Sequence, residues 1–174
     1  MEQKAKNVSP FSNESRNAYV VEHLTSSMLA LLKEKPIGDI SISELCSMAG
    51  VGRTSFYRNY GEKEDIVKAY VKHLFQDWVD KYKEAPDLPV KEVVRIVFSH
   101  FEANRELYTL LNERGLVYLL KDIILELCGF NPEQEMPAAY SSAYVAFFLY
   151  GWIEVWFRRG MKDTTEELIV YLPQ

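Results

Sequence analysis

Apolar residues recur along this chain at the three- and four-residue spacing of amphipathic helices. In the first such segment, one stripe carries Val20, Leu24, Met28 and Leu31, with mainly polar residues on the other side. No run of alternating apolar and polar residues is long enough, or rich enough in β-branched residues, to predict a sheet. The pattern therefore predicts an all-α protein.

Prolines and glycines divide this pattern into separate helices. Pro36 and Gly38 end the first helix, and the two prolines of EAPDLP end the long fourth helix. No internal repeat or low-complexity segment is visible. The expected helices span residues 15–34, 42–49, 53–60, 63–83, 90–102, 104–112, 116–128, 138–159 and 165–172.

Composition indicates an ordinary globular chain. It has 174 residues, of which 48% are hydrophobic, and a net charge of −5, so bulk charge gives no support for nucleic-acid binding. Cys46 and Cys128 match neither a CxxC nor a metal-ligand spacing, which favours a reducing, cytoplasmic setting with both thiols buried.

Residues 1–14 are expected to form a flexible polar arm without the apolar core of a signal peptide. The longest uncharged apolar run ends at Glu154, short of the ~20 residues that span a bilayer, so no membrane helix is expected.

The segment ISISELCSMAGVGRTSFYRNY, residues 40–60, predicts two short helices joined by a tight turn. Ser41 stands three residues before Glu44, the spacing of a capping box, and this places a helix start near Ile42. Gly50 suits the left-handed position that ends such a helix. A second short helix then begins at Arg53.

This second helix separates packing residues from residues that face outward. Phe56 and Tyr60 lie four residues apart on one face. The other face carries Arg53, Thr54, Tyr57 and Arg58. Such a face suits a DNA major groove, where arginine reaches guanine edges or phosphates and threonine contacts a thymine methyl group. An ordinary solvated helix surface is the alternative interpretation of the same pattern.

The longer segment ISISELCSMAGVGRTSFYRNYGEKEDI closely resembles the helix-turn-helix of the TetR/AcrR family of bacterial transcriptional regulators. The shared features are a capped helix, an Ala-Gly-Val turn, the aromatic pair Phe56-Tyr57 and the pair Lys63-Glu64 at the next helix start. The resemblance implies a three-helix DNA-binding domain over 15–65. It also implies a larger helical dimerisation and ligand domain over 66–174, to which HFEANRELYTLLNERG and GWIEVWFRRGMKDTTEEL bear a weaker resemblance.

The same resemblance implies the residues that contact double-stranded operator DNA. By this resemblance, bases or nearby phosphates are contacted by Arg53, Thr54 and Ser55. The DNA backbone is contacted by Tyr57, Asn59 and Lys63. The expected DNA-binding residues also include Ser41 and Arg58. Two positions depart from the family pattern, because Gly52 replaces a usual serine and Asn59 a frequent histidine. These departures bear on operator preference and affinity rather than on the fold.

Residues 66–174 hold 18 of the 23 aromatic side chains. In the helix over 138–159 they cover more than one face, which predicts a homodimer seam, with burial at the centre of the monomer as the alternative. The expected seam residues are Tyr144, Phe148, Gly151, Trp152, Val155 and Trp156. Glu154 and Arg158, four residues apart, are expected to form an ion pair at its rim.

Aromatic residues on three successive expected helices predict an apolar pocket for a small-molecule effector, with a filled core as the alternative. The expected lining is Phe75, Trp78, Tyr82, Phe98, Phe101 and Tyr108. The resulting hypothesis is a homodimeric repressor that a small apolar or aromatic ligand releases from a palindromic operator. A helical adaptor or co-activator controlled by a protein partner is the alternative.

Catalysis is not expected from this sequence. The three histidines, His23, His73 and His100, lie on separate expected helices with no catalytic motif around them. No cofactor or metal site is expected either.

Overall fold

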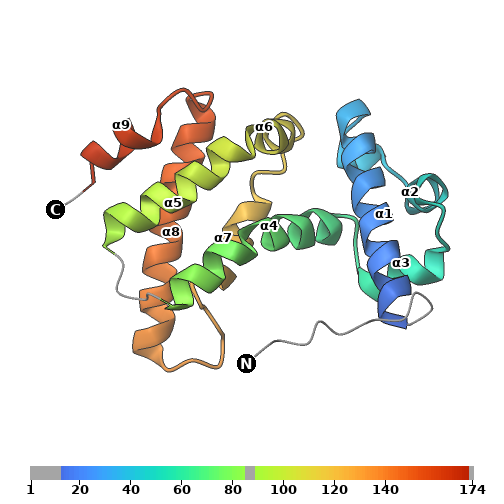
Figure 1. Ribbon diagram of the computed structural model, residues 1–174, viewed down its shortest axis with the longest axis horizontal. Helices are drawn as coiled ribbons and strands as arrows, with labels where there is room; N and C mark the ends of the chain where they lie inside the picture. The colour runs from blue at the N-terminus through green and yellow to red at the C-terminus, as the bar shows by residue number, and fades with distance from the viewer. Residues whose placement is uncertain (1–12, 85–88, 173–174) are drawn as a thin grey trace, which may run out of the picture. The chain divides into compact units, whose positions relative to one another are not determined.

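The chain is helical throughout the part that the structure describes (Figure 1). This computed structural model describes residues 13–84 and 89–172, with no side chains described between 77 and 88. The predicted all-α class is confirmed, since these residues contain no strand. The chain divides into two compact units at the bond between Val67 and Lys68, which lies inside a helix.

The first unit contains α1 (Asn13–Glu34), the 3₁₀ turn η1 (Ile37–Asp39), α2 (Ile42–Ala49), α3 (Arg53–Asn59) and the start of α4 (Glu64–Glu84). Helix α1 packs against both α2 and α3. The unit has one apolar core, built from the buried side chains of Leu24, Met28, Leu32, Leu45, Phe56 and Ile66. Of the arm expected over 1–14, only Asn13 and Glu14 are described, and both belong to α1.

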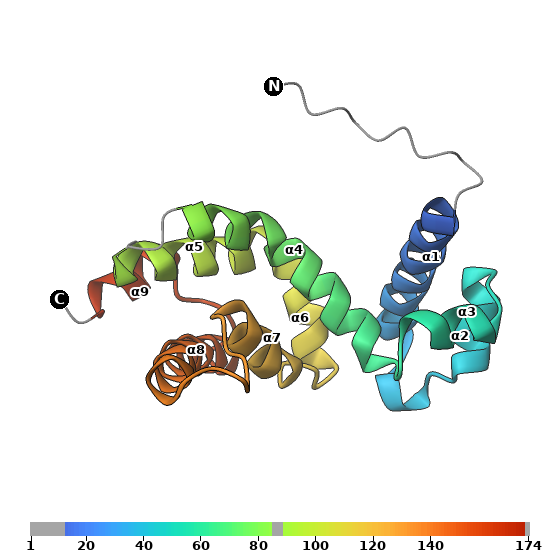
Figure 2. The same ribbon diagram turned by 90° about the horizontal axis from the view of Figure 1, so that it is seen from below.

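The second unit contains the rest of α4, α5 (Val90–Ala103), α6 (Arg105–Glu113), α7 (Leu119–Leu127), α8 (Met136–Arg158) and α9 (Thr165–Val170). Helix α7 packs against α8, and α9 lies along α5, as Figures 1 and 2 show. The observed helix ends differ from the predicted ones by at most three residues. None of the helices in the two described stretches is long and apolar enough to cross a bilayer.

Polar contacts fix α9 to the helices around it. The backbone N–H of Thr165 donates to Glu102 Oε1 of α5 at 3.1 Å. The Arg105 guanidinium donates to the Met161 carbonyl at 2.8 Å and lies 5.5 Å from the centre of the Trp156 ring. Because the turn between α8 and α9 is held in this way, the two helices form the walls of a groove described below.

Candidate nucleic-acid interface

The turn between α2 and α3 has the geometry that its residues predict. Ser41 caps α2, with its hydroxyl accepting from the Glu44 backbone N–H at 3.1 Å. The Glu44 carboxylate also pairs with Lys35 at 2.7 Å, and this hydrogen bond lowers the pKa of Glu44. Gly50 ends α2 with φ +65°, in the left-handed region that favours glycine. Gly52 is the N-cap of α3 and supplies no side-chain hydrogen bond.

The predicted division of α3 into two faces is confirmed. Phe56 is fully buried and packs edge-on against the Tyr57 ring at 5.2 Å between centroids. Tyr60 is also buried, which raises its pKa, and its hydrogen bond with Thr25 of α1 acts in the opposite direction. The outward face carries the exposed side chains of Arg53, Thr54, Tyr57 and Arg58, with Ser55 half-buried beside them. A rigidly packed helix therefore presents two cations, hydroxyls and an aromatic ring to solvent.

Besides Ser41, two of the expected DNA-binding residues make internal hydrogen bonds. The Asn59 amide donates to the Ser55 carbonyl at 2.9 Å. The Lys63 ammonium donates to the carbonyls of Ile37 and Ile40, each at 2.6 Å. Lys63 thus joins the turn before α4 to the 3₁₀ turn before α2, so it stabilises the arrangement of the helices that carry the exposed face. The sequence pattern contains no signal for this contact, since the partners are carbonyls more than twenty residues away.

A broad open groove runs between the first turns of α1 and the α2–α3 turn, within the first unit. Its lining brings Arg16 and Asn17 of α1 together with Ser55, Arg58 and Asn59. Both α1 residues are exposed. No sequence signal marks Arg16 or Asn17 as candidate DNA-binding residues, because they lie more than thirty positions before α3 and only the fold brings α1 against it. The charged side chains of this lining are Arg16, Arg58 and Glu14, so two cations face one carboxylate and the net charge of the groove is positive.

A family comparison decides the identity of this unit. Residues 25–70 match the model of bacterial regulatory proteins of the tetR family. The first unit therefore carries the DNA-binding domain of the TetR family. The chain is accordingly a DNA-binding transcriptional regulator with an N-terminal helix-turn-helix domain, and members of this family are typically not enzymes.

A solved structure has a similar fold. The crystal structure of Lin0861 from Listeria innocua superposes with a TM-score of 0.66, over 92% of this chain and 91% of that chain. The two sequences are 16% identical, so the likeness is one of fold. No curated protein matches the chain.

In the second unit, the residues predicted to line a pocket pack against one another. Phe75, Phe98, Phe101 and Tyr108 are all buried. The Phe101 ring lies 4.3 Å from Tyr108, 5.8 Å from Phe75 and 6.3 Å from Phe98, measured between centroids. The side chains of Trp78 and Tyr82, the other two residues of the predicted lining, lie outside the described residues. We call the four described residues the ring cluster.

Helix α8 presents most of the predicted seam residues to solvent. Tyr144 is 77% exposed and Val155 is 55% exposed, Gly151 is exposed, and Phe148 and Trp152 are half-buried. Trp156 differs, because it is fully buried against Phe98 and Phe101 of α5. Five residues beyond Gly151, it points about 140° around the helix axis and faces the core. The predicted Glu154–Arg158 ion pair is present, at 2.9 Å.

His100 and Tyr108 form a polar contact at the edge of the described ring cluster. His100 Nε2 lies 2.7 Å from the Tyr108 hydroxyl, and the imidazole stacks on Phe75 at 3.9 Å between centroids. Burial lowers the pKa of His100 from 6.5 to about 4 and raises the pKa of Tyr108. Both groups are therefore neutral near pH 7.

We expect this burial to make the second unit less stable in mild acid. The unfolded chain protonates His100 near pH 6.5 but the folded chain only near pH 4, so stability is complete above about pH 6.5 and declines as the pH falls toward 4. Because the ring keeps some solvent contact, we expect about 1–2 kcal/mol rather than the full shift. Urea unfolding across this range should show a shallower pH dependence for His100→Gln, which cannot titrate. Equal slopes for both proteins would contradict this assignment.

Proposed function

We propose that this TetR family regulator is a homodimeric repressor that binds a near-palindromic operator through α3. The observation that carries the proposal is the exposed face of α3, which offers Arg53, Thr54, Tyr57 and Arg58 from a helix anchored by Phe56. Arginine and threonine on such a face are suited to base edges, and tyrosine to a phosphate oxygen. Ser55 completes this surface.

The remaining predicted residues support the reading helix in different ways. Ser41 and Lys63 act through the fold, since Ser41 caps α2 and Lys63 holds the two turns together. Asn59 and Arg16 of α1 both line the groove of the first unit. We propose that this groove contacts phosphate next to the bases read by α3, because two arginines among uncharged donors outnumber its one carboxylate, Glu14.

A homodimer would account for both a near-palindromic operator and the exposed apolar face of α8. Two copies related by a two-fold axis present two α3 helices, and these match half-sites about 34–36 Å apart or a multiple of that spacing. The exposed apolar face of α8 is the surface that supports this assembly, because large aromatic side chains in water favour a partner.

Release by a small apolar or aromatic ligand is the regulatory part of the proposal. Such a ligand would have to separate side chains of the ring cluster, which are in direct contact in the described structure. Helix α4 carries Phe75 of this cluster and also contributes its first residues to the DNA-binding unit, so it connects the two. Ligand and DNA would then oppose each other reciprocally.

The close packing of the ring cluster favours a second candidate, in which a protein partner rather than a ligand controls the regulator. A thermal-shift screen of apolar and aromatic metabolites, followed by DNA titration with each hit, separates the two. Ligands that stabilise the protein and lower operator affinity would support ligand release. Stabilising ligands without effect on DNA binding would argue against it.

The central experiment is capture of genomic DNA on the full-length protein, followed by footprinting of the recovered site. On that site, we expect Arg53→Ala to weaken binding by about 1–3 kcal/mol and to relax the preference at one base pair, if its guanidinium bonds a guanine edge. Tyr57→Phe, which removes only a hydroxyl from the same face, should weaken all sequences similarly. Unchanged affinity in both variants, with helicity retained, would refute the assignment of α3.

A further inference from the structure

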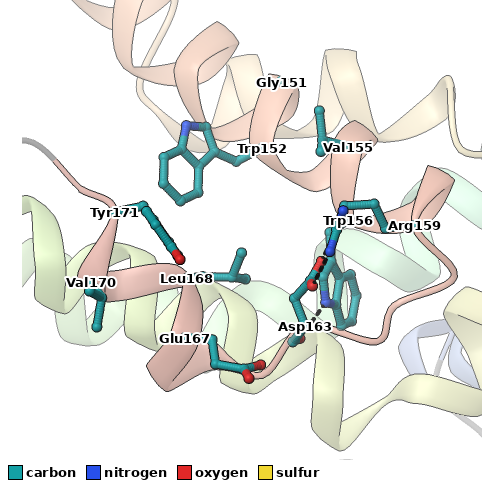
Figure 3. Close-up of a pocket in the computed structure, with 10 residues that line it drawn as sticks. All are labelled: Gly151, Trp152, Val155, Trp156, Arg159, Asp163, Glu167, Leu168, Val170 and Tyr171. Carbon is teal, nitrogen blue, oxygen red and sulfur yellow. Dashed lines mark hydrogen bonds and ion pairs between the residues drawn. The ribbon is translucent and has the colours of Figure 1, made fainter.

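An open groove lies between α8 and α9, within the second unit, as Figure 3 shows. Its volume of about 580 Å³ falls within the range of roughly 300–1,000 Å³ that is typical of small-molecule sites. Trp152 and Tyr171 lie at one end, the Arg159–Asp163 ion pair lies at the other, and Leu168 lies between them. None of these residues belongs to the ring cluster, so the groove is a separate candidate site.

Hydrogen bonds hold the backbone of both groove walls in place. The Trp156 Nε1–H donates to the Asp163 carbonyl at 2.8 Å, which ties the end of α8 to the turn before α9. The backbone N–H of Tyr171 donates to the Leu168 carbonyl at 3.2 Å, and the next residue, Leu172, is buried. The fixed walls limit the ordering that a ligand has to impose on the protein.

Two aromatic rings give one end of the groove a surface that suits a flat ligand. Trp152 is half-buried and stacks on Phe148 at 5.6 Å between ring centroids, whereas Tyr171 is 79% exposed. The two side chains come from opposite walls, Trp152 from α8 and Tyr171 from the residue that follows α9 (Figure 3). The faces of indole and phenol rings are electron-rich, so they attract cations as well as other aromatic rings.

The charges of the lining distinguish between a cationic and an anionic ligand. Among the described residues that line the groove, one cation, Arg159, and two carboxylates, Asp163 and Glu167, give a net charge of −1. Arg159 and Asp163 neutralise each other, with Nη2 of the arginine 2.7 Å from Oδ1 of the aspartate. Glu167 remains, and hydrogen bonds from the Thr164 backbone and hydroxyl lower its pKa, so it is ionised near pH 7. The lining therefore favours a positive charge.

We propose that the groove between α8 and α9 binds an organic cation that carries a flat aromatic ring system. The ring system lies against Trp152 and Tyr171, and the positive charge lies toward Glu167. The two aromatic side chains provide most of the contact area, whereas Glu167 sets the preference for charge. Binding here does not require the packed side chains of the ring cluster to separate.

Three probes of nearly the same shape and different charge test this proposal. N-methylquinolinium is a cation, methylnaphthalene is its neutral counterpart, and naphthoate is an anion. Equilibrium dialysis against the full-length protein measures the Kd of each probe. From a cation–π contact and one exposed carboxylate, we expect the cation to bind about 3- to 30-fold more tightly than the neutral probe, and the anion to bind most weakly. Equal affinities for the cation and the neutral probe, or no measurable binding of the cation, would overturn the proposal.

Variants at two positions locate the bound probe. Glu167→Gln removes the charge but keeps the capping box of α9, in which glutamine can replace glutamate. This variant should lose the preference for the cation while its affinity for methylnaphthalene stays unchanged. Glu166→Gln is the matched control, because Glu166 does not line the groove and instead pairs with Arg95 of α5, and it should keep the preference. Tyr171→Ala should weaken the cation and the neutral probe alike. Binding that neither Glu167→Gln nor Tyr171→Ala alters would lie elsewhere and would overturn the assignment.

The variants are confined to α9 and the residue after it for a structural reason. Gly151, Trp152 and Val155 of the α8 wall are also expected seam residues of the proposed homodimer. Substitutions at positions 167 and 171 therefore change the groove without changing that face of α8. The dialysis contains no DNA, so its result is independent of the repressor proposal.

Discussion

Replacing Trp156 by alanine should unfold the second unit at a markedly lower denaturant concentration. The side chain is fully buried and its ring contacts Phe98 and Phe101. Its Nε1–H donates to the Asp163 carbonyl at 2.8 Å, which helps to hold the α8–α9 turn. Removal of a buried indole leaves a cavity and an unsatisfied carbonyl, so we expect a loss of about 3–5 kcal/mol in the free energy of unfolding.

Trp152→Ala is the matched control for this prediction. Trp152 lies one turn earlier on α8, is half-buried, and stacks on Phe148 at 5.6 Å. Its loss should cost clearly less, because the space it leaves opens to solvent. Urea unfolding followed by circular dichroism measures both. Equal losses of stability in the two variants would show that Trp156 is not the buried core residue described above.

Replacing Phe56 by alanine should abolish operator binding without removing a single DNA-contacting group. Phe56 is the fully buried residue of α3 and packs against Tyr57 and Tyr60. A seven-residue helix is too short to persist without such packing. We expect about 3–5 kcal/mol of destabilisation of the first unit and loss of DNA binding at temperatures where the wild type binds.

Tyr57→Ala distinguishes this effect from the loss of a contact. Its side chain is 53% exposed on the adjacent position of α3. We expect the Tyr57 variant to unfold near the wild-type temperature while binding the operator more weakly. Thermal unfolding and duplex titration on both variants provide the comparison. A Phe56 variant that unfolds like the wild type would contradict the role of this ring as the anchor of α3.

Much of the first unit follows from local signals in the sequence. The spacing of Ser41 and Glu44 specifies where α2 begins, and Gly50 specifies where it ends, because caps and left-handed positions depend on neighbouring residues only. The alternation of faces on α3 follows from the helical period alone. These features were predictable, and with them the resemblance to the TetR family that the family comparison confirms.

Long-range contacts were not predictable in the same way. The DNA contact of Lys63 stays a prediction, whereas the structure shows that its ammonium lies against two carbonyls more than twenty residues away. Arg16 lies beside α3 only because α1 packs against it. No local pattern in the sequence records which backbone carbonyl a lysine reaches or which helix lies across a groove.

Helix α8 combines a feature that the sequence determined with one that only the tertiary structure decided. Its sequence alone determined that large apolar side chains cover more than one face of the helix, which predicts a partner surface with burial inside the monomer as the alternative. Only the tertiary structure decided that Trp156 belongs to the core and that Val155, its neighbour, faces solvent. The physical reason is that residue type sets how strongly a side chain avoids water, whereas the packing of α7 and of the α5 rings against the helix sets which side chains do so.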